Sequence, residues 1–231
     1  MQELAVSTVI FDGYDFSTAF SSLERQNISF VEIAYIDGYV SFKEEDLTAK
    51  TGKNLKSLLN QHHLKCRTFG AHIDFGTVDA PERMKRRFEV AASAGAQMVI
   101  TNACFVGDED QFYDNIIKAE KLAAQYDLLI GLENTGFARK TVCTDAKELA
   151  DVVKKLNLSH VKANYDTANV VTYSWGTKQP TEGIESLGDT LWSLHLKDTK
   201  KTPEGCYQMC PVGTGEVNNK AVLQALKGSE F

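Results

Sequence analysis

The sequence predicts an α/β fold, a (β/α)8 barrel that lacks its eighth strand and helix. Short apolar or β-branched runs alternate with longer segments whose apolar residues follow a helical period. The ends of these runs recur about once every 30 residues, which is the length of one βα unit. Seven such units occupy the 231 residues, whereas a closed barrel of this kind needs about 250 residues and one further strand.

Seven segments are expected to form the strands, because each is short, apolar and bounded by polar or turn residues. They are residues 4–10, 30–35, 66–72, 97–102, 128–133, 161–166 and 191–196. Helices are expected between them. In the third helix Asp79 and Pro81 form a start signal and Gly95 a stop signal. A doubly wound sheet fits the same alternation, but no Gly-rich phosphate-binding pattern follows the first strand to support it.

The length predicts a single domain over residues 1–231, truncated at its C-terminus before the eighth unit. The formal net charge of −6 disfavours a nucleic-acid-binding surface. No apolar run approaches the roughly 18 residues that span a bilayer, and no signal-peptide pattern is visible. The five cysteines are scattered and odd in number, which fits a reducing compartment. We therefore expect a cytoplasmic protein that binds neither nucleic acid nor membrane.

Three potential metal ligands end three successive predicted strands. Glu133, Asp166 and His195 each close a different apolar run. In a parallel barrel the carboxyl ends of the strands surround one pocket, so these side chains are expected to converge. Two carboxylates and an imidazole suit one divalent cation, Mn²⁺, Mg²⁺, Co²⁺ or Zn²⁺. Such an ion polarises a carbonyl and stabilises an enediolate while a carboxylate moves a proton on the adjacent carbon.

Six short segments also occur in the order typical of one family. They are FVEI at residues 30–33, GAH at 70–72, GLEN at 131–134, YDTAN at 165–169, HLKD at 195–198 and GTGEV at 213–217. With these segments the chain resembles the xylose isomerase-like TIM barrels, the sugar phosphate isomerase/epimerase superfamily. The resemblance covers nearly the whole chain. The last three segments are specific when taken together, although each is weak alone.

The resemblance implies a (β/α)8 TIM barrel in which Glu133, Asp166 and His195 bind the metal. It also implies that Glu133 is one half of an acid/base pair acting across a sugar carbon. In the family the other half is a glutamate on strand eight, and no residue here matches it. Glu216 belongs to the Gly-rich loop before the last helix, and Glu230 precedes the expected strand. The sequence therefore contains three of the four expected elements of the site.

Five further residues are weaker candidates. His72 and Lys197 are expected to assist catalysis, although His72 can equally be a packed core histidine and Lys197 a simple ion-pair partner. Glu32, Asn134 and Asn169 are expected to bind substrate. Glu32 can instead form a salt bridge at the rim, and Asn169 stands where several relatives carry a histidine.

The leading hypothesis is a divalent-metal-dependent isomerase or epimerase of a sugar, sugar phosphate or polyol. A dehydratase or lyase of keto-sugars or inososes uses the same intermediate and stays a close alternative. A non-catalytic sugar-binding barrel is another alternative, because the fourth ligand is missing. A zinc nuclease like endonuclease IV is disfavoured by the few histidines and the negative charge. Open edges on the first and last strands also predict association, so a homo-oligomer is expected.

Overall fold

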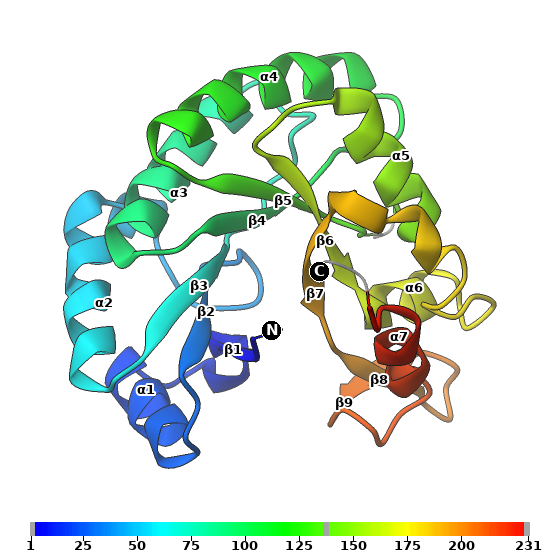
Figure 1. The fold of residues 1–231 in the computed structure, drawn as a ribbon, viewed down its shortest axis with the longest axis horizontal. Coiled ribbons are helices and arrows are strands. Elements are labelled where there is room, and N and C mark those ends of the chain that lie inside the picture. The colour runs from blue at the N-terminus through cyan, green and yellow to red at the C-terminus, as the bar shows by residue number, and fades with distance from the viewer. Residues whose placement is uncertain (1–2, 136–138, 229–231) are drawn as a thin grey trace. The chain divides into compact units, whose positions relative to one another are not determined.

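The computed structural model describes residues 3–135 and 139–228, which divide into two compact units. The first unit contains the chain up to Thr101 together with Asp114–Ile130. The second contains Asn102–Tyr113 and the chain from Gly131 onward. Figure 1 shows the elements of each unit, with the N-terminal elements in blue and the C-terminal ones in red.

The first unit is built on parallel strands that pair in chain order. These are β1 (Ala5–Ser7), β2 (Phe30–Ala34), β3 (Lys65–Gly70) and β4 (Met98–Asn102), whose last residue falls in the second unit. The helices are α1 (Phe16–Arg25), α2 (Ala49–Gln61), α3 (Ala80–Ala94) and the later part of α4 (Glu109–Gln125). Helices α2 and α3 pack side by side (Figure 1). Fully buried side chains, including Phe20, Ile33, Phe69, Phe88 and Met98, form the core.

The helix boundaries in this unit follow local signals in the sequence. The Asp15 side chain caps α1 by accepting a hydrogen bond from the Thr18 N–H. Helix α3 begins after Asp79 with Pro81 in its first turn, as predicted. It ends at Gly95, whose φ of 87° lies in the left-handed region that favours glycine.

The second unit contains the end of β5 (Leu129–Glu133) and the remaining elements of the chain. These are α5 (Ala146–Leu156), β6 (Val161–Asp166), α6 (Thr167–Tyr173), β7 (Leu191–His195), β8 (Asp198–Lys201), β9 (Tyr207–Cys210) and α7 (Asn219–Ala225). Strands β6 and β7 are parallel, whereas β8 and β9 form a separate antiparallel hairpin. Short 3-10 helices cover Thr8–Phe11, Glu44–Asp46, Ile184–Ser186 and Gly188–Thr190 of the two units. No helix of the described residues is long and apolar enough to cross a membrane.

The predicted fold class is confirmed. Seven parallel strands, numbered in chain order and alternating with helices, give the topology of a (β/α)8 barrel without its eighth unit. Among the described residues, the hairpin and α7 follow β7, and no eighth parallel strand does. The single-domain organisation and the C-terminal truncation stay predictions, as does the homo-oligomer.

The first strand and the segment after β7 differ from the prediction for physical reasons. The first strand stops at Ser7 instead of Ile10, because the Ser7 side chain accepts a hydrogen bond from the Val9 N–H and starts a 3-10 helix. The β8–β9 hairpin is not among the seven predicted strands. Its strands are only four residues long, and β8 carries only polar side chains, so the hairpin lacks a run with an apolar period.

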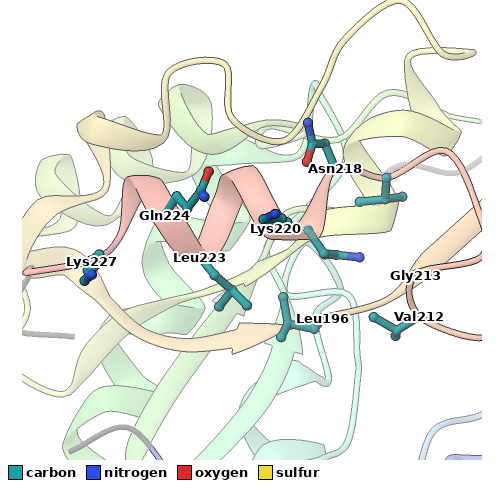
Figure 2. A pocket seen from close by; sticks show the side chains of 10 residues that line it. Leu196, Val212, Gly213, Asn218, Lys220, Leu223, Gln224 and Lys227 are labelled. Atoms are coloured by element: carbon teal, nitrogen blue, oxygen red, sulfur yellow. The ribbon is translucent and has the colours of Figure 1, made fainter.

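An apolar groove of about 550 Å³ lies beside α7 in the second unit. Leu196, Val212 and Leu223 line it, with Lys220 and Lys227 among its polar residues (Figure 2). Val212 is 56% exposed and Leu223 44% exposed, so α7 leaves part of its apolar face uncovered among the described residues. None of the three predicted metal ligands lines this groove.

A buried arginine joins three elements of the first unit. Arg87 on α3 is fully buried. Its guanidinium donates to Glu44 Oε1 at 2.6 Å and Oε2 at 3.0 Å, and to the Ala71 carbonyl at 3.2 Å. The hydrogen bond from Arg87 is the main cause that lowers the pKa of Glu44 to about 2. The pair therefore fixes the segment after β2 and the segment after β3 to α3.

We predict that Glu44→Gln lowers the free energy of unfolding by about 1–3 kcal/mol at pH 7. A fully buried pair would cost roughly 3–5 kcal/mol, but the Glu44 side chain is 36% exposed and partly screened. Because the folded pKa is depressed, the contribution is complete above the ordinary value of 4.5 and is lost as the pH falls toward about 2. Urea unfolding at several pH values measures this difference. Glu45→Gln, an exposed neighbour, is the control, and equal effects of both variants would contradict the prediction.

Candidate metal and catalytic site

The three predicted ligands end three strands, as the sequence indicated. Glu133 is the last residue of β5, Asp166 of β6 and His195 of β7. Asp166 and His195 are direct partners in the parallel register of β6 and β7. All three residues belong to the second unit. Their side chains therefore come together at the carboxyl ends of the strands, where parallel α/β proteins place functional groups.

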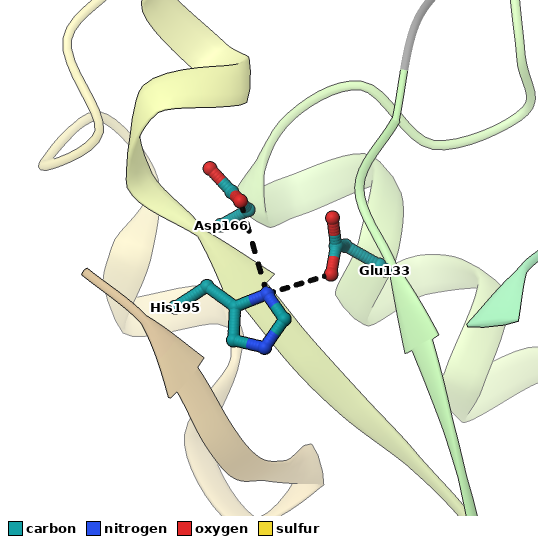
Figure 3. A group of neighbouring side chains, drawn as sticks. All are labelled: Glu133, Asp166 and His195. Carbon is teal, nitrogen blue, oxygen red and sulfur yellow. Dashed lines mark ion pairs between the residues drawn. The ribbon is translucent and has the colours of Figure 1, made fainter. Parts of the chain in front are cut away.

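The side chains of Glu133, Asp166 and His195 converge closely (Figure 3). One donor atom from each lies within 4.8 Å of the other two. His195 Nδ1 lies 2.9 Å from Glu133 Oε2 and 3.8 Å from Asp166 Oδ2. Glu133 and Asp166 are buried, and the His195 side chain is 15% exposed. Two carboxylate oxygens and an imidazole nitrogen in this arrangement form a donor set that suits a divalent cation.

Two asparagine amides orient the Glu133 carboxylate. Asn164 Nδ2 donates to Glu133 Oε2 at 2.6 Å, and Asn169 Nδ2 donates to Oε1 at 3.1 Å. Asn169 Nδ2 is also 2.9 Å from the Asn134 carbonyl. Hydrogen bonds to both oxygens favour the ionised form of a carboxylate. Glu133 is therefore held in one orientation by hydrogen bonds to both of its oxygens.

Asp166 uses its two carboxylate oxygens differently. Oδ1 accepts the N–H groups of Ala168 and Asn169, each at 2.9 Å, and so caps α6. Oδ2 is buried and lies 2.5 Å from Lys197 Nζ. The two groups form an ion pair, and Oδ2 accepts no hydrogen bond from the described residues. The oxygen that points at His195 is therefore the one with coordination capacity left over.

The backbone at the end of β6 is fixed by one amide side chain. Asn134 Oδ1 accepts the Asp166 N–H at 2.7 Å, and Asn134 Nδ2 donates to the Asp166 carbonyl at 3.0 Å. Asn134 directly follows Glu133, so this amide connects the ends of β5 and β6. It therefore sets the separation of the two carboxylates.

Residues of α6 and α7 form hydrogen bonds with the backbone of the segment that carries His195 and Lys197. The Lys197 N–H donates to the Thr167 hydroxyl at 3.2 Å, and Asn219 Nδ2 donates to the Lys197 carbonyl at 2.8 Å. Thr167 Oγ1 and Asn219 Oδ1 are 2.8 Å apart. Thr167 is fully buried and Asn219 nearly so. These contacts fix the direction in which His195 and Lys197 leave β7.

Glu32 and His72 occupy positions that differ from the predicted ones, and both lie in the first unit. Glu32 is the middle residue of β2 instead of its end, because pairing with β3 continues to Ala34. Its carboxylate is buried and accepts a hydrogen bond from Thr68 Oγ1 at 2.8 Å. His72 lies two residues beyond the end of β3 at Gly70. The proposed roles of both residues in substrate binding and catalysis stay predictions.

Sequence reasoning missed Asn164, Thr167 and Asn219 as members of the site. Asn164 had a usable signal, since it precedes Asp166 by two positions on a strand and must share its face. Thr167 and Asn219 had no such signal, because their contacts join residues far apart in the chain.

The described residues place neither of the two late glutamates in the site. The Glu216 carboxylate accepts hydrogen bonds from the Lys201 N–H and the Tyr207 hydroxyl of the hairpin, and Glu230 lies outside the described residues.

Comparison with known proteins decides the family. Residues 20–231 match the family described as xylose isomerase-like TIM barrel. The chain belongs to this family. Among curated proteins, no sequence matches the chain.

Solved structures of similar fold include several sugar epimerases. A D-tagatose 3-epimerase-like protein is 18% identical with a TM-score of 0.75, covering 98% of this chain and 86% of its own. The IOLI protein with a binding zinc atom is 18% identical with a TM-score of 0.76, covering 98% and 84%. D-allulose 3-epimerase from Methylomonas sp. in complex with D-allulose is 16% identical with a TM-score of 0.74, covering 97% and 79%. At these identities the likeness shows the fold of the chain.

We predict that Asn134→Ala lowers the free energy of unfolding by about 2–4 kcal/mol. The substitution leaves the buried N–H and carbonyl of Asp166 without the partners that Asn134 provides. Denaturant unfolding measures the loss. Asn54→Ala, at an exposed position of α2, serves as the control and should change stability by less than about 0.5 kcal/mol. A loss no larger than that of the control would contradict the structural role of Asn134.

Proposed function

We propose that this protein is a divalent-metal-dependent isomerase or epimerase of a sugar, sugar phosphate or polyol, acting by proton transfer next to a carbonyl. The observation that carries the proposal is the convergence of Glu133, Asp166 and His195 within 4.8 Å at the ends of parallel strands. The sugar epimerases among the structures of similar fold support the substrate class. The zinc atom of the IOLI protein supports a metal in this family.

The charge balance of the site supports a bound cation. Glu133 and Asp166 are both buried, and burial of like charges is costly unless a positive charge compensates them. Lys197 supplies one positive charge, although its side chain is 40% exposed. A divalent ion held by Glu133, Asp166 and His195 would supply Lewis-acid chemistry at a substrate oxygen.

The described residues offer a base for the first half of the proton transfer. Glu133, whose Oε1 accepts a hydrogen bond from Asn169, is the proposed base that removes a proton from the carbon next to the carbonyl. Lys197, which pairs with Asp166, is proposed to donate to a substrate oxygen as negative charge develops there. We retain His72 as a proposed assisting group and Glu32, Asn134 and Asn169 as proposed substrate contacts.

Two alternatives use the same residues. A dehydratase or lyase of keto-sugars or inososes also begins with removal of a proton next to a carbonyl, so Glu133 would act identically. A non-catalytic sugar-binding barrel would keep the metal and the substrate contacts but show no turnover. A screen of ketoses and inososes with added Mn²⁺, analysed for epimers and for dehydrated products, separates the three.

We predict that Glu133→Gln lowers turnover by about 10²–10⁴-fold, the usual contribution of a general base. In D₂O the wild-type protein should place deuterium on the reacting carbon, detected by NMR, and the variant should not. Glu185→Gln, an exposed residue of the second unit, is the control. Full activity in Glu133→Gln, with an intact fold by circular dichroism, would contradict the role of Glu133.

We also predict that the double variant Asp166→Ala with His195→Ala no longer binds a divalent metal. Protein loaded with Mn²⁺ and desalted is analysed for metal by mass spectrometry. The pair Asp189→Ala with His160→Ala changes the same residue types outside the site and should keep the metal. The absence of any divalent ion from loaded wild-type protein would overturn the metal-dependent mechanism.

A further inference from the structure

We propose that Asn164 is a fourth protein ligand of the cation, bound through its side-chain carboxamide oxygen. The inference rests on the proposed metal site at Glu133, Asp166 and His195, and adds a residue that neither the sequence pattern nor the family match assigns. It follows from the placement of the Asn164 amide, the distances around it and its one buried atom without a partner.

The strand geometry directs Asn164 toward the site. Asn164 and Asp166 are two residues apart on β6, so their side chains leave the same face of the strand. In the register with β7, Asn164 is opposite Ser193, and Asp166 is opposite His195. Asn164 is completely buried. Asn164 therefore presents its amide on the same face of β6 as the Asp166 carboxylate, away from solvent.

The amide end of Asn164 occupies the position of a donor atom. Asn164 Nδ2 lies 2.6 Å from Glu133 Oε2 and 3.2 Å from His195 Nδ1, and these two atoms are 2.9 Å apart. The three atoms therefore form a triangle with sides close to 3 Å. Neighbouring ligand atoms around a cation with bonds of about 2.1 Å are about 3.0–3.4 Å apart. The triangle thus has the size of one face of a coordination shell.

A rotation of the amide places an oxygen at that position. The two ends of a carboxamide have nearly the same shape, and a half turn about the last side-chain bond exchanges them. In the orientation seen, Asn164 Oδ1 is buried and has no hydrogen-bond partner among the described residues. The half turn therefore breaks no hydrogen bond at the Oδ1 end. It also moves the two Nδ2 donors to that buried position, a cost that coordination of the ion must offset. At the other end the bond to Glu133 is replaced by coordination of both groups to one ion.

The chemistry of the donor set favours an amide oxygen. Glu133 and Asp166 already supply two negative charges, which balance a divalent cation. A carboxamide oxygen adds a ligand without adding charge, and such oxygens are regular ligands of hard divalent ions. Asn164 would thus add a neutral amide oxygen to the two carboxylates and the imidazole.

Asn169 provides a matched comparison. It also donates to the Glu133 carboxylate, at 3.1 Å, but to the other oxygen, and its Nδ2 is satisfied by the Asn134 carbonyl as well. It therefore orients Glu133 as a hydrogen-bond donor. Loss of such a partner can itself weaken metal binding by about 10–100-fold, so affinity alone does not identify a ligand.

The experiment detects the ligand directly on the whole chain. Protein containing asparagine labelled with ¹³C at Cγ is loaded with Mn²⁺, and electron–nuclear double resonance records the coupling of the ion to ¹³C. If Oδ1 binds the ion, the Asn164 Cγ lies about 3 Å away, within range of a resolved coupling. The coupling should disappear in Asn164→Ala and Asn164→Asp and persist in Asn169→Ala. Asn164→Asp preserves the size of the side chain. Its spectrum can therefore be compared with that of the wild-type protein even where Asn164→Ala does not fold.

Each outcome decides the proposal. Loss of the coupling only in the position-164 variants, with Mn²⁺ still bound to Asn164→Asp, supports Asn164 as a ligand. Bound Mn²⁺ without asparagine coupling in wild-type protein overturns that assignment and leaves the proposed enzyme function standing. Wild-type protein that takes up no Mn²⁺ contradicts the ligand assignment and the metal-dependent function together.

Discussion

The functional region depends on the burial of two carboxylates next to each other. Glu133 and Asp166 end neighbouring strands and are almost inaccessible to solvent. Such a pair would repel strongly in a dry interior unless donors and positive charges surround it. The surroundings meet this need with amide N–H groups on Glu133, backbone N–H groups on Asp166 and the Lys197 ammonium. This electrostatic requirement explains why the amides of Asn164 and Asn169 both donate to the Glu133 carboxylate.

The direct passage from β6 into α6 gives Asp166 its orientation. Asp166 is the last residue of the strand and the N-cap of the helix that begins at Thr167. One carboxylate oxygen must face the first turn of α6, which leaves the other to face His195 and Lys197. The position of a potential ligand atom is therefore fixed by helix capping, a local interaction, and not by the metal. A site preformed in this way loses little conformational entropy when an ion binds.

The sequence predicted the elements whose apolar residues follow a clear strand or helix pattern. It missed the elements that depend on tertiary contacts. Apolar runs located β6 correctly at both ends and β5 and β7 to within a residue at each end, which was enough to bring Glu133, Asp166 and His195 together. It did not locate the β8–β9 hairpin, whose strands are only four residues long and pair with each other. Asn164 was overlooked because a polar residue inside a strand usually signals exposure, although its position two residues before Asp166 places it on the face of the site.

The Gly-rich segment after the hairpin links the end of β7 to α6 by contacts between residues far apart in the sequence. Burial raises the pKa of Asp198, but N–H groups of Gly215, Val217, Gly213 and Thr199 outweigh it, so the pKa lies below its ordinary value. A side chain at Gly215 would overlap the Asp198 carboxylate, which explains the glycine.

Val217, fixed by this carboxylate, packs on Ala168 and Val171 of α6. A continuous series of contacts thus runs from His195 through Asp198 and Val217 to α6, and from α6 to its N-cap, Asp166. A displacement of Asp166 or His195 would strain these contacts. The HLKD and GTGEV segments therefore act together to hold Asp166 and His195 at a constant separation.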